Sequence, residues 1–230
     1  MDMLSNFIKY VILKILNFIE FKTNIIHGEP FLMAKVSLSA IQELRQITGL
    51  GMLDCKNALE ATDGNIEKAI EELRKKGTSI AGKRAGNTTA EGIVVSYIHP
   101  GDQTGVLVEL NCETDFVART ATTKAFAQDI AMHIAAMKPQ FLDQENVDAA
   151  FLAKEEEIAR EVLKNEGKPA AMIDKIVEGK MKKIYSEVCL LQQTFIKDEK
   201  RTVEELLKDL IAKTGENIRI KRFARFEVGN

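Results

Sequence analysis

The stretch GIVVSYIHPGDQTGVLVELNC, residues 92–112, contains two runs of β-forming residues separated by a turn. In the second run, an apolar side chain occurs at every even position from Val106 to Cys112. A period of two places such side chains on one face of a strand. The sequence HPGD at 99–102 is rich in turn-forming residues. We therefore predict an antiparallel hairpin with one face against a core.

The sequence after the hairpin combines helical and strand patterns. Helical spacing predicts helices near 118–137, 146–166 and 169–185, and a capping box at 202–205 opens another that ends at Gly215. Strands are predicted at 189–196 and from Ile218 to the C-terminus. In that last strand the apolar face is expected to hold Ile218, Ile220, Ala224, Phe226 and Val228. One-sided alternation is typical of an antiparallel sheet covered by helices on one side, which predicts an α+β core at 92–230.

Residues 33–82 predict a separate module of three short helices. Ser37 is a helix cap, residues 49–51 (GLG) and 63–65 (DGN) are breaks, and Gly77 is the expected end of the third helix. Single apolar stripes on short helices must be buried against one another. The pattern resembles the three-helix fold of ubiquitin-associated domains. Small, polar residues after Gly77 indicate a linker, which we place at 83–91.

Residues 1–32 have a different character from the rest of the chain. Their apolar run is interrupted by Lys9, Lys14 and Glu20, which leaves segments too short to span a membrane. No small-residue cleavage site of the secretory type follows. A membrane-surface helix is one interpretation. We favour the other, that translation starts at Met33 and that 1–32 is upstream sequence.

Composition narrows the class of protein. The chain has 230 residues, 34 acidic against 32 basic, and a net charge of −2, which argues against duplex nucleic acid as the main partner. The cysteines, Cys55, Cys112 and Cys189, are odd in number and far apart. This spacing predicts reduced thiols in the cytoplasm, and it provides no ligand pairs for a zinc site. No metal or cofactor is expected.

The segment NCETDFVA, residues 111–118, joins the hairpin to the next helix. One interpretation is structural, with Thr114 or Asp115 capping the helix and Phe116 or Val117 anchoring it in the core. The other places Phe116 at an exposed tip beside a carboxylate, because connections between rigid elements often carry function. Spacing alone leaves both open.

Several long motifs resemble the elongation factor Ts family. They are residues 45–77, the segment NCETDFVA, IAMHIAAMKPQF at 130–141, residues 166–195, and ENIRIKRFARFEVG at 216–229. They occur in the order typical of that family and cover the chain from about residue 33 to its end. The resemblance implies a guanine nucleotide exchange factor that releases GDP from elongation factor Tu, and not an enzyme.

The resemblance also implies which residues meet the partner. Asp115 and Phe116 correspond to the pair that intrudes near the Mg²⁺ and phosphate site of the GTPase, within the motif TDFV. The N-terminal module contacts the same part of the GTPase, and a histidine in the following helix lies at the family's interface. The full set expected here is Thr114, Asp115, Phe116, Val117, Arg45, Met52, Leu53 and His133. For His133, a place in the core is the competing interpretation, because it falls beside Ile130 and Ile134. For Met52 and Leu53, which follow the break at 49–51, a place in the core is likewise the alternative to exposure on a docking surface.

The chain differs from longer members of the family. A second core repeat and a helical-hairpin insertion are expected to be missing. Short members pair as dimers through the core, so a homodimer is also expected. Neither direct nucleic-acid binding nor a membrane partner is expected.

Two rival functions stay open at this point. Cys112, His133 and Asp115 could be drawn as nucleophile, base and orienting group of an enzyme. However, Cys112 falls on the apolar face of its strand, and no glycine turn flanks it. The second rival is a binding module that uses the three-helix domain alone and exchanges no nucleotide.

Overall fold

The computed structural model describes residues 36–229, and the predictions for residues 1–32 and Met33 lie outside this range. The chain divides into two compact units, the first ending at Ile70 and the second beginning at Glu71. The described α-helices are α2 (Leu38–Thr48), α3 (Met52–Ala61), α4 (Ile66–Arg84), α5 (Asp115–Arg119), α6 (Ala121–Met137), α7 (Ala149–Asn165), α8 (Ala170–Val188) and α9 (Val203–Thr214). The strands are β1 (Glu91–Ile98), β2 (Thr104–Cys112), β3 (Thr194–Phe195), β4 (Asp198–Thr202) and β5 (Ile218–Glu227). The predicted mixture of helices and an antiparallel sheet is confirmed.

The first unit begins with the helices that the sequence predicts. The Ser37 side chain accepts a hydrogen bond from the backbone of Ala40 and so caps α2. Gly49, with φ of 69°, ends α2 in the left-handed conformation. Leu44 and Leu59 are fully buried. The likeness to ubiquitin-associated domains and the domain boundaries given above stay predictions.

Helix α4 is longer than the sequence predicts. The expected end at Gly77 is wrong, because the helix continues to Arg84. A side chain at Gly77 would bring its Cβ within 3.2 Å of the Ala212 Cβ on α9. The glycine therefore allows close packing of two helices and does not stop one. Ile80 and Ala81, in the stretch after Gly77 whose composition is typical of a linker, pack in the core of the second unit.

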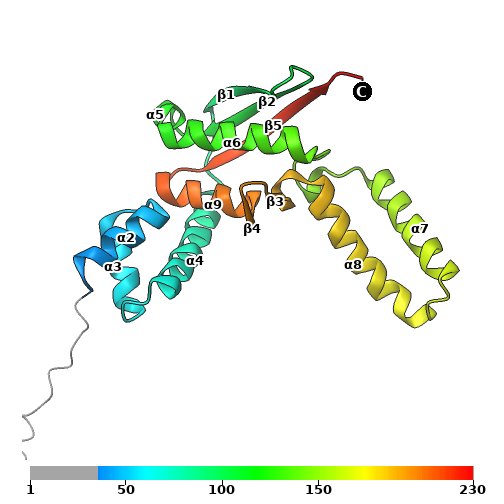
Figure 1. Ribbon diagram of the computed structural model, residues 1–230, viewed down its shortest axis with the longest axis horizontal. Coiled ribbons are helices and arrows are strands. Elements are labelled where there is room, and N and C mark those ends of the chain that lie inside the picture. The colour runs from blue at the N-terminus through cyan, green and yellow to red at the C-terminus, as the bar shows by residue number, and fades with distance from the viewer. Residues whose placement is uncertain (1–35, 230) are drawn as a thin grey trace, which may run out of the picture. The chain divides into compact units, whose positions relative to one another are not determined.

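The second unit is built on a three-stranded antiparallel sheet in the order β1-β2-β5. The hairpin prediction is confirmed, with Val95 opposite Val108 and Ile98 opposite Gly105. The even-numbered apolar side chains of β2 are buried, as predicted. Figure 1 shows α6 running along one face of the sheet. The core there joins β2 and β5 to α5, α6 and α9.

The predicted face of β5 is wrong beyond its first residues. Ile220 pairs with Leu110 but Arg222 pairs with Glu109, so a β-bulge adds one residue to β5. A one-residue shift moves every later side chain to the opposite face. Ile218 and Ile220 are buried, whereas Phe226 is 67% exposed.

The predicted strand at 189–196 is mostly another structure. Residues Leu190–Gln192 form a 3-10 turn, Thr194–Phe195 pair with the unpredicted strand β4, and Cys189 forms an isolated bridge with Phe141. Gln193 is buried, and its side-chain amide donates to the carbonyl of Glu187 at 2.6 Å. A buried polar side chain bonded to the backbone in this way holds an irregular segment.

Helices α7 and α8 form a helical hairpin with a small apolar cluster of its own, made by Ala159, Leu163, Ile173 and Val177. Gly167, with φ of 72°, turns the chain between them. Both helices were predicted, and the expected lack of a second core repeat and of an insertion relative to longer family members stays a prediction. Within residues 36–229, no helix is long and apolar enough to cross a membrane.

Candidate functional site

The motif at 111–118 begins where β2 ends and continues into α5. Cys112 is the last residue of β2, and Thr114 is the N-cap of α5 with φ of −127° and ψ of 153°. The Thr114 hydroxyl accepts a hydrogen bond from the backbone of Val117 at 3.4 Å. A threonine in this conformation stabilises the first turn of a helix. The predicted capping role of Thr114 is confirmed.

The first turn of α5 points one aromatic side chain outward. Phe116 is 78% exposed, the largest exposed fraction among the large apolar residues in the described range. Its neighbours Val117 and Ala118 are 6% and 2% exposed and belong to the core. The helix is thus anchored by the residues that follow Phe116. Val117 is an anchor, and its expected place on the contact surface is contradicted by this burial.

Asp115 is exposed beside Phe116. Its carboxylate forms an ion pair with Arg119, one helical turn later, at 3.1 Å. Exposed pairs of this spacing contribute little to stability. The Asp115 carboxylate is therefore accessible to a partner, and binding there would break only one weak ion pair.

Two glutamates that the sequence analysis did not single out hold the base of the motif. Glu216 accepts hydrogen bonds from the Thr114 hydroxyl at 2.6 Å and the Thr114 amide at 3.0 Å. Glu113 accepts a hydrogen bond from the Asn217 backbone amide at 2.6 Å, and both of its carboxylate oxygens accept from the Asn87 side-chain amide at 3.0 Å. These bonds, first that from Asn217, lower the pKa of Glu113. Little in the sequence indicates these roles, apart from the place of each glutamate beside the end of a predicted strand.

His133 is fully buried, which contradicts its expected place at the surface. The backbone amide of Ile196 donates to Nδ1 at 3.2 Å, so the ring hydrogen lies on Nε2 and is donated to Gln193 Oε1 at 2.9 Å. Burial lowers the pKa of His133, an effect that the hydrogen bond to Gln193 opposes. The neutral ring thus ties α6 to the irregular segment at 190–196.

The first unit carries the other predicted contact residues. Arg45 lies in the last turn of α2, and Met52 and Leu53 lie in the first turn of α3. Arg45 is exposed, while Met52 and Leu53 are 38% and 69% exposed. The competing interpretation, that both apolar side chains are core, is contradicted. The three residues flank the connection at 49–51.

Comparison with known proteins places these features in a family. The family model described as Elongation factor TS matches residues 36–230. The chain belongs to the elongation factor Ts family. It is 53% identical over 197 residues to elongation factor Ts of Desulforamulus reducens, covering 86% of this chain and 91% of that protein. It is 55% identical over 194 residues to that of Caldanaerobacter subterraneus, covering 84% and 97%.

The elongation factor Ts of Thermotoga neapolitana is 52% identical over 195 residues, which covers 85% of this chain and 98% of that protein. Membership of the family makes the chain an elongation factor of protein biosynthesis. It also implies a role in nucleotide exchange on elongation factor Tu. The resemblance drawn from the sequence is confirmed.

The enzyme-like arrangement drawn from the sequence is not assembled in this elongation factor. The Cys112 thiol donates to the Thr114 carbonyl at 3.0 Å, and burial raises its pKa. Both His133 nitrogens are engaged by Gln193 and Ile196. Among residues 36–229, no group of three or more His, Cys, Asp or Glu side chains is placed to hold a metal ion.

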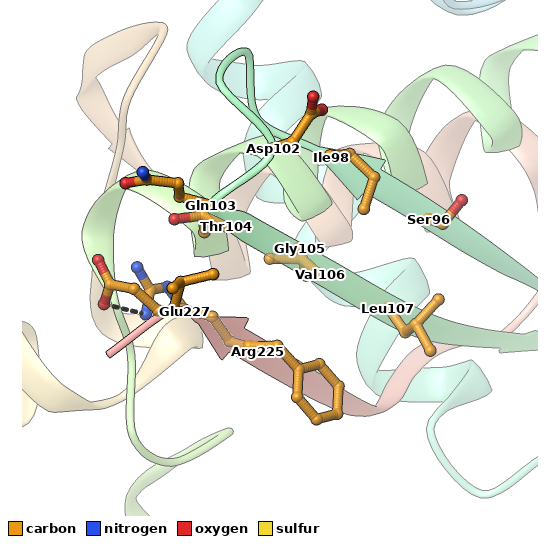
Figure 2. Close-up of a pocket in the computed structure, with 12 residues that line it drawn as sticks. Ser96, Ile98, Asp102, Gln103, Thr104, Gly105, Val106, Leu107, Arg225 and Glu227 are labelled. Carbon is orange, nitrogen blue, oxygen red and sulfur yellow. Dashed lines mark hydrogen bonds and ion pairs between the residues drawn. The ribbon is translucent and has the colours of Figure 1, made fainter. Parts of the chain in front are cut away.

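The face of the sheet opposite α6 is apolar and exposed. Exposed fractions are 67% for Val94, 59% for Ile98, 46% for Leu107 and 67% for Phe226. A hollow of about 670 Å³ lies on this face at the turn end of the hairpin, where Asp102 and Gln103 join its lining. Figure 2 shows Ile98 and Leu107 on neighbouring strands among the residues that line it. Exposed apolar groups that gather in this way mark an interaction surface.

Proposed function

We propose that this chain promotes GDP release from elongation factor Tu by inserting Phe116 and Asp115 beside the Mg²⁺ and phosphate site of the GTPase, with no covalent step. The observation that carries the proposal is the 78% exposure of Phe116 on a helix whose next two residues are buried. A rigid, exposed aromatic side chain enters a partner's pocket with little loss of conformational entropy. Mg²⁺ needs nearly ideal octahedral geometry, so a small displacement of its ligands weakens the bound nucleotide.

The energy of exchange must come from more than Phe116. Moving a partner from mostly GDP-bound to mostly released takes about 5.5 kcal/mol of differential affinity. Burying one phenylalanine contributes roughly 1.5–3 kcal/mol. Thr114 and Asp115 add polar contacts, and Arg45, Met52 and Leu53 provide a second contact surface on the first unit. By linkage, GDP weakens binding of the factor as much as the factor weakens binding of GDP.

The test is release of fluorescent GDP from elongation factor Tu. Phe116→Ala should slow release by about ten- to a hundredfold, which is the loss of one buried phenylalanine expressed as a rate. Its melting temperature should match that of the unchanged chain, because the ring is exposed. Met172→Ala, which removes a 55% exposed side chain from α8, is the control and should exchange normally. Normal exchange by Phe116→Ala would contradict the proposal.

The second candidate function is binding without exchange through the first unit, favoured by the exposure of Met52 and Leu53. It predicts that Leu53→Ala weakens binding of elongation factor Tu, while the unchanged chain leaves GDP release at its spontaneous rate. Acceleration of release by the unchanged chain rules this candidate out.

We also propose that two copies of the chain pair through the open face of the sheet. The exposed apolar residues Val94, Ile98, Leu107 and Phe226 support this, since a twofold pairing would cover the same face on both copies. Light scattering after size exclusion should give the mass of a dimer. Leu107→Lys should give the mass of a monomer. A monomeric unchanged chain would contradict the pairing.

A further inference from the structure

The strand ends below the motif are joined by two reciprocal side-chain contacts. Cys112 pairs with Ile218 as the last pair in the register of β2 and β5, and Glu113 and Thr114 follow on one strand as Asn217 and Glu216 precede on the other. In place of further ladder bonds, Glu113 of one strand binds the backbone of Asn217, and Glu216 of the other binds the backbone of Thr114. We name Glu113 and Glu216 the carboxylate clamp.

Glu216 also supports the N-cap of α5. The Thr114 hydroxyl donates to Glu216 at 2.6 Å, so its lone pairs are left to accept from the Val117 amide. The resulting series of hydrogen bonds runs from the Val117 amide through the Thr114 hydroxyl to the charged carboxylate of Glu216. Hydrogen bonds to charged acceptors are shorter and stronger than neutral ones, and bonds in a chain polarise one another.

The position of Glu216 is itself set by local structure. Gly215, with φ of 72°, ends α9 in the left-handed conformation and turns the chain into β5. Asn217 is buried, and its side chain donates to the carbonyl of Asn87 at 2.8 Å. The carboxylate therefore starts from a backbone that is fixed on both sides.

We infer that Glu216 is a positioning residue for nucleotide exchange, which holds the first turn of α5 so that Phe116 is presented in one orientation. This rests on the proposed function of Phe116. Without the clamp, Phe116 would still be exposed, but the turn that carries it would lose its charged anchor and sample more conformations. Ordering that turn on binding would then weaken the complex and slow exchange.

The first test needs no partner. Glu216→Gln keeps the size of the side chain but removes the charge and one acceptor oxygen. The amides of Thr114 and Val117 should then exchange hydrogen faster by about three- to tenfold, as expected for a weakened charge-assisted bond, while the amides of β1 do not change. Glu199→Gln, on an exposed part of β4, is the matched control. Unchanged protection at both amides in Glu216→Gln would overturn the inference.

The second test separates positioning from general stability. In the GDP-release assay, Glu216→Gln should slow exchange by about three- to tenfold. In a chain that already carries Phe116→Ala, the same change should cause no further slowing, because Glu216 acts through the ring. Equal slowing in both backgrounds would overturn the inference. If the unchanged chain does not accelerate GDP release, the proposed function fails, and amide exchange still decides whether Glu216 orders the turn.

Discussion

At the scale of single residues, burial and the hydrogen-bond partners of His133 together determine its protonation state. His133 accepts a hydrogen bond at Nδ1 and donates one at Nε2, an arrangement that only the neutral ring can make. The exposure of Phe116, an apolar side chain, likewise depends on its surroundings. The residues beside it enter the core, and the helical turn leaves the ring outside.

His133 should make stability depend on pH. Burial holds its pKa below the ordinary value of 6.5, so the unfolded chain binds this proton more readily than the folded chain. The stabilisation is complete above about pH 6.5 and is lost as the pH falls from there toward the lower folded pKa. The slope should not exceed about 1.4 kcal/mol per pH unit.

Urea unfolding between about pH 7.5 and pH 5.5 measures this effect, since histidines titrate in that range. His133→Gln should be less stable at the upper pH and should lose most of the slope. An identical slope in the variant would show that other groups cause it.

The three cysteines should resist alkylation in the folded chain. All are buried, and burial raises the pKa of Cys112 and raises that of Cys189 to about 11. Because the thiolate is the reactive form, iodoacetamide should modify the native chain far more slowly than the urea-unfolded chain. Mass spectrometry counts the modified thiols. Rapid modification of Cys112 in the native chain would contradict its buried position.

At the scale of elements, close approach of backbones explains glycines that a turn does not require. A Cβ at Gly92 would lie 2.3 Å from the Leu110 carbonyl oxygen on the paired strand. Gly77 likewise allows α4 and α9 to pack closely. Their role is not evident from the sequence, where Gly77 is read as a helix end, because the neighbouring element is distant in the chain.

Gly92→Ala should lower the free energy of unfolding by about 1–3 kcal/mol, as other overpacked positions do. The matched control is Gly179→Ala in the interior of α8, where nothing lies within 4 Å of an added Cβ. That change should raise stability by up to about 1 kcal/mol, because alanine favours helix. Chemical denaturation of both variants gives the comparison. Equal effects would show that Gly92 is not confined by Leu110.

At the scale of the whole molecule, the chain is organised as two compact units with one helix shared between them. The boundary falls after Ile70, within α4, and the later part of that helix carries Ile80 and Ala81 into the core of the second unit. Residues after Gly77 therefore belong to the fold of the second unit, although their composition is typical of a linker.

Shortening the chain tests this assignment. A fragment of residues 71–230 should melt at a higher temperature than one of residues 92–230. Losing one buried aliphatic side chain costs about 1.5–3 kcal/mol, and each kcal/mol shifts the melting temperature by roughly 2–4 °C at this size. Equal melting temperatures would contradict the packing of α4 on the core.

The sequence alone determined features whose causes lie within a few residues. Ser37, Gly49 and the capping box of Thr202 with Glu205 start and stop helices through bonds to adjacent backbone. The alternation in β2 predicted its buried face, and the motif at 111–118 indicated the family. Exposure of Met52 and Leu53 was one of two interpretations that the pattern allowed.

The tertiary structure alone decided which side chains face solvent where distant elements meet. The bulge opposite Glu109 reversed the face of β5 and put Phe226 outside, because the extra residue is defined by pairing with β2. Val117 and His133 became core because β2, α9 and the segment at 190–196 pack over them. Burial depends on what covers a residue, and for His133 part of the cover comes from Ile196, 63 positions away along the chain.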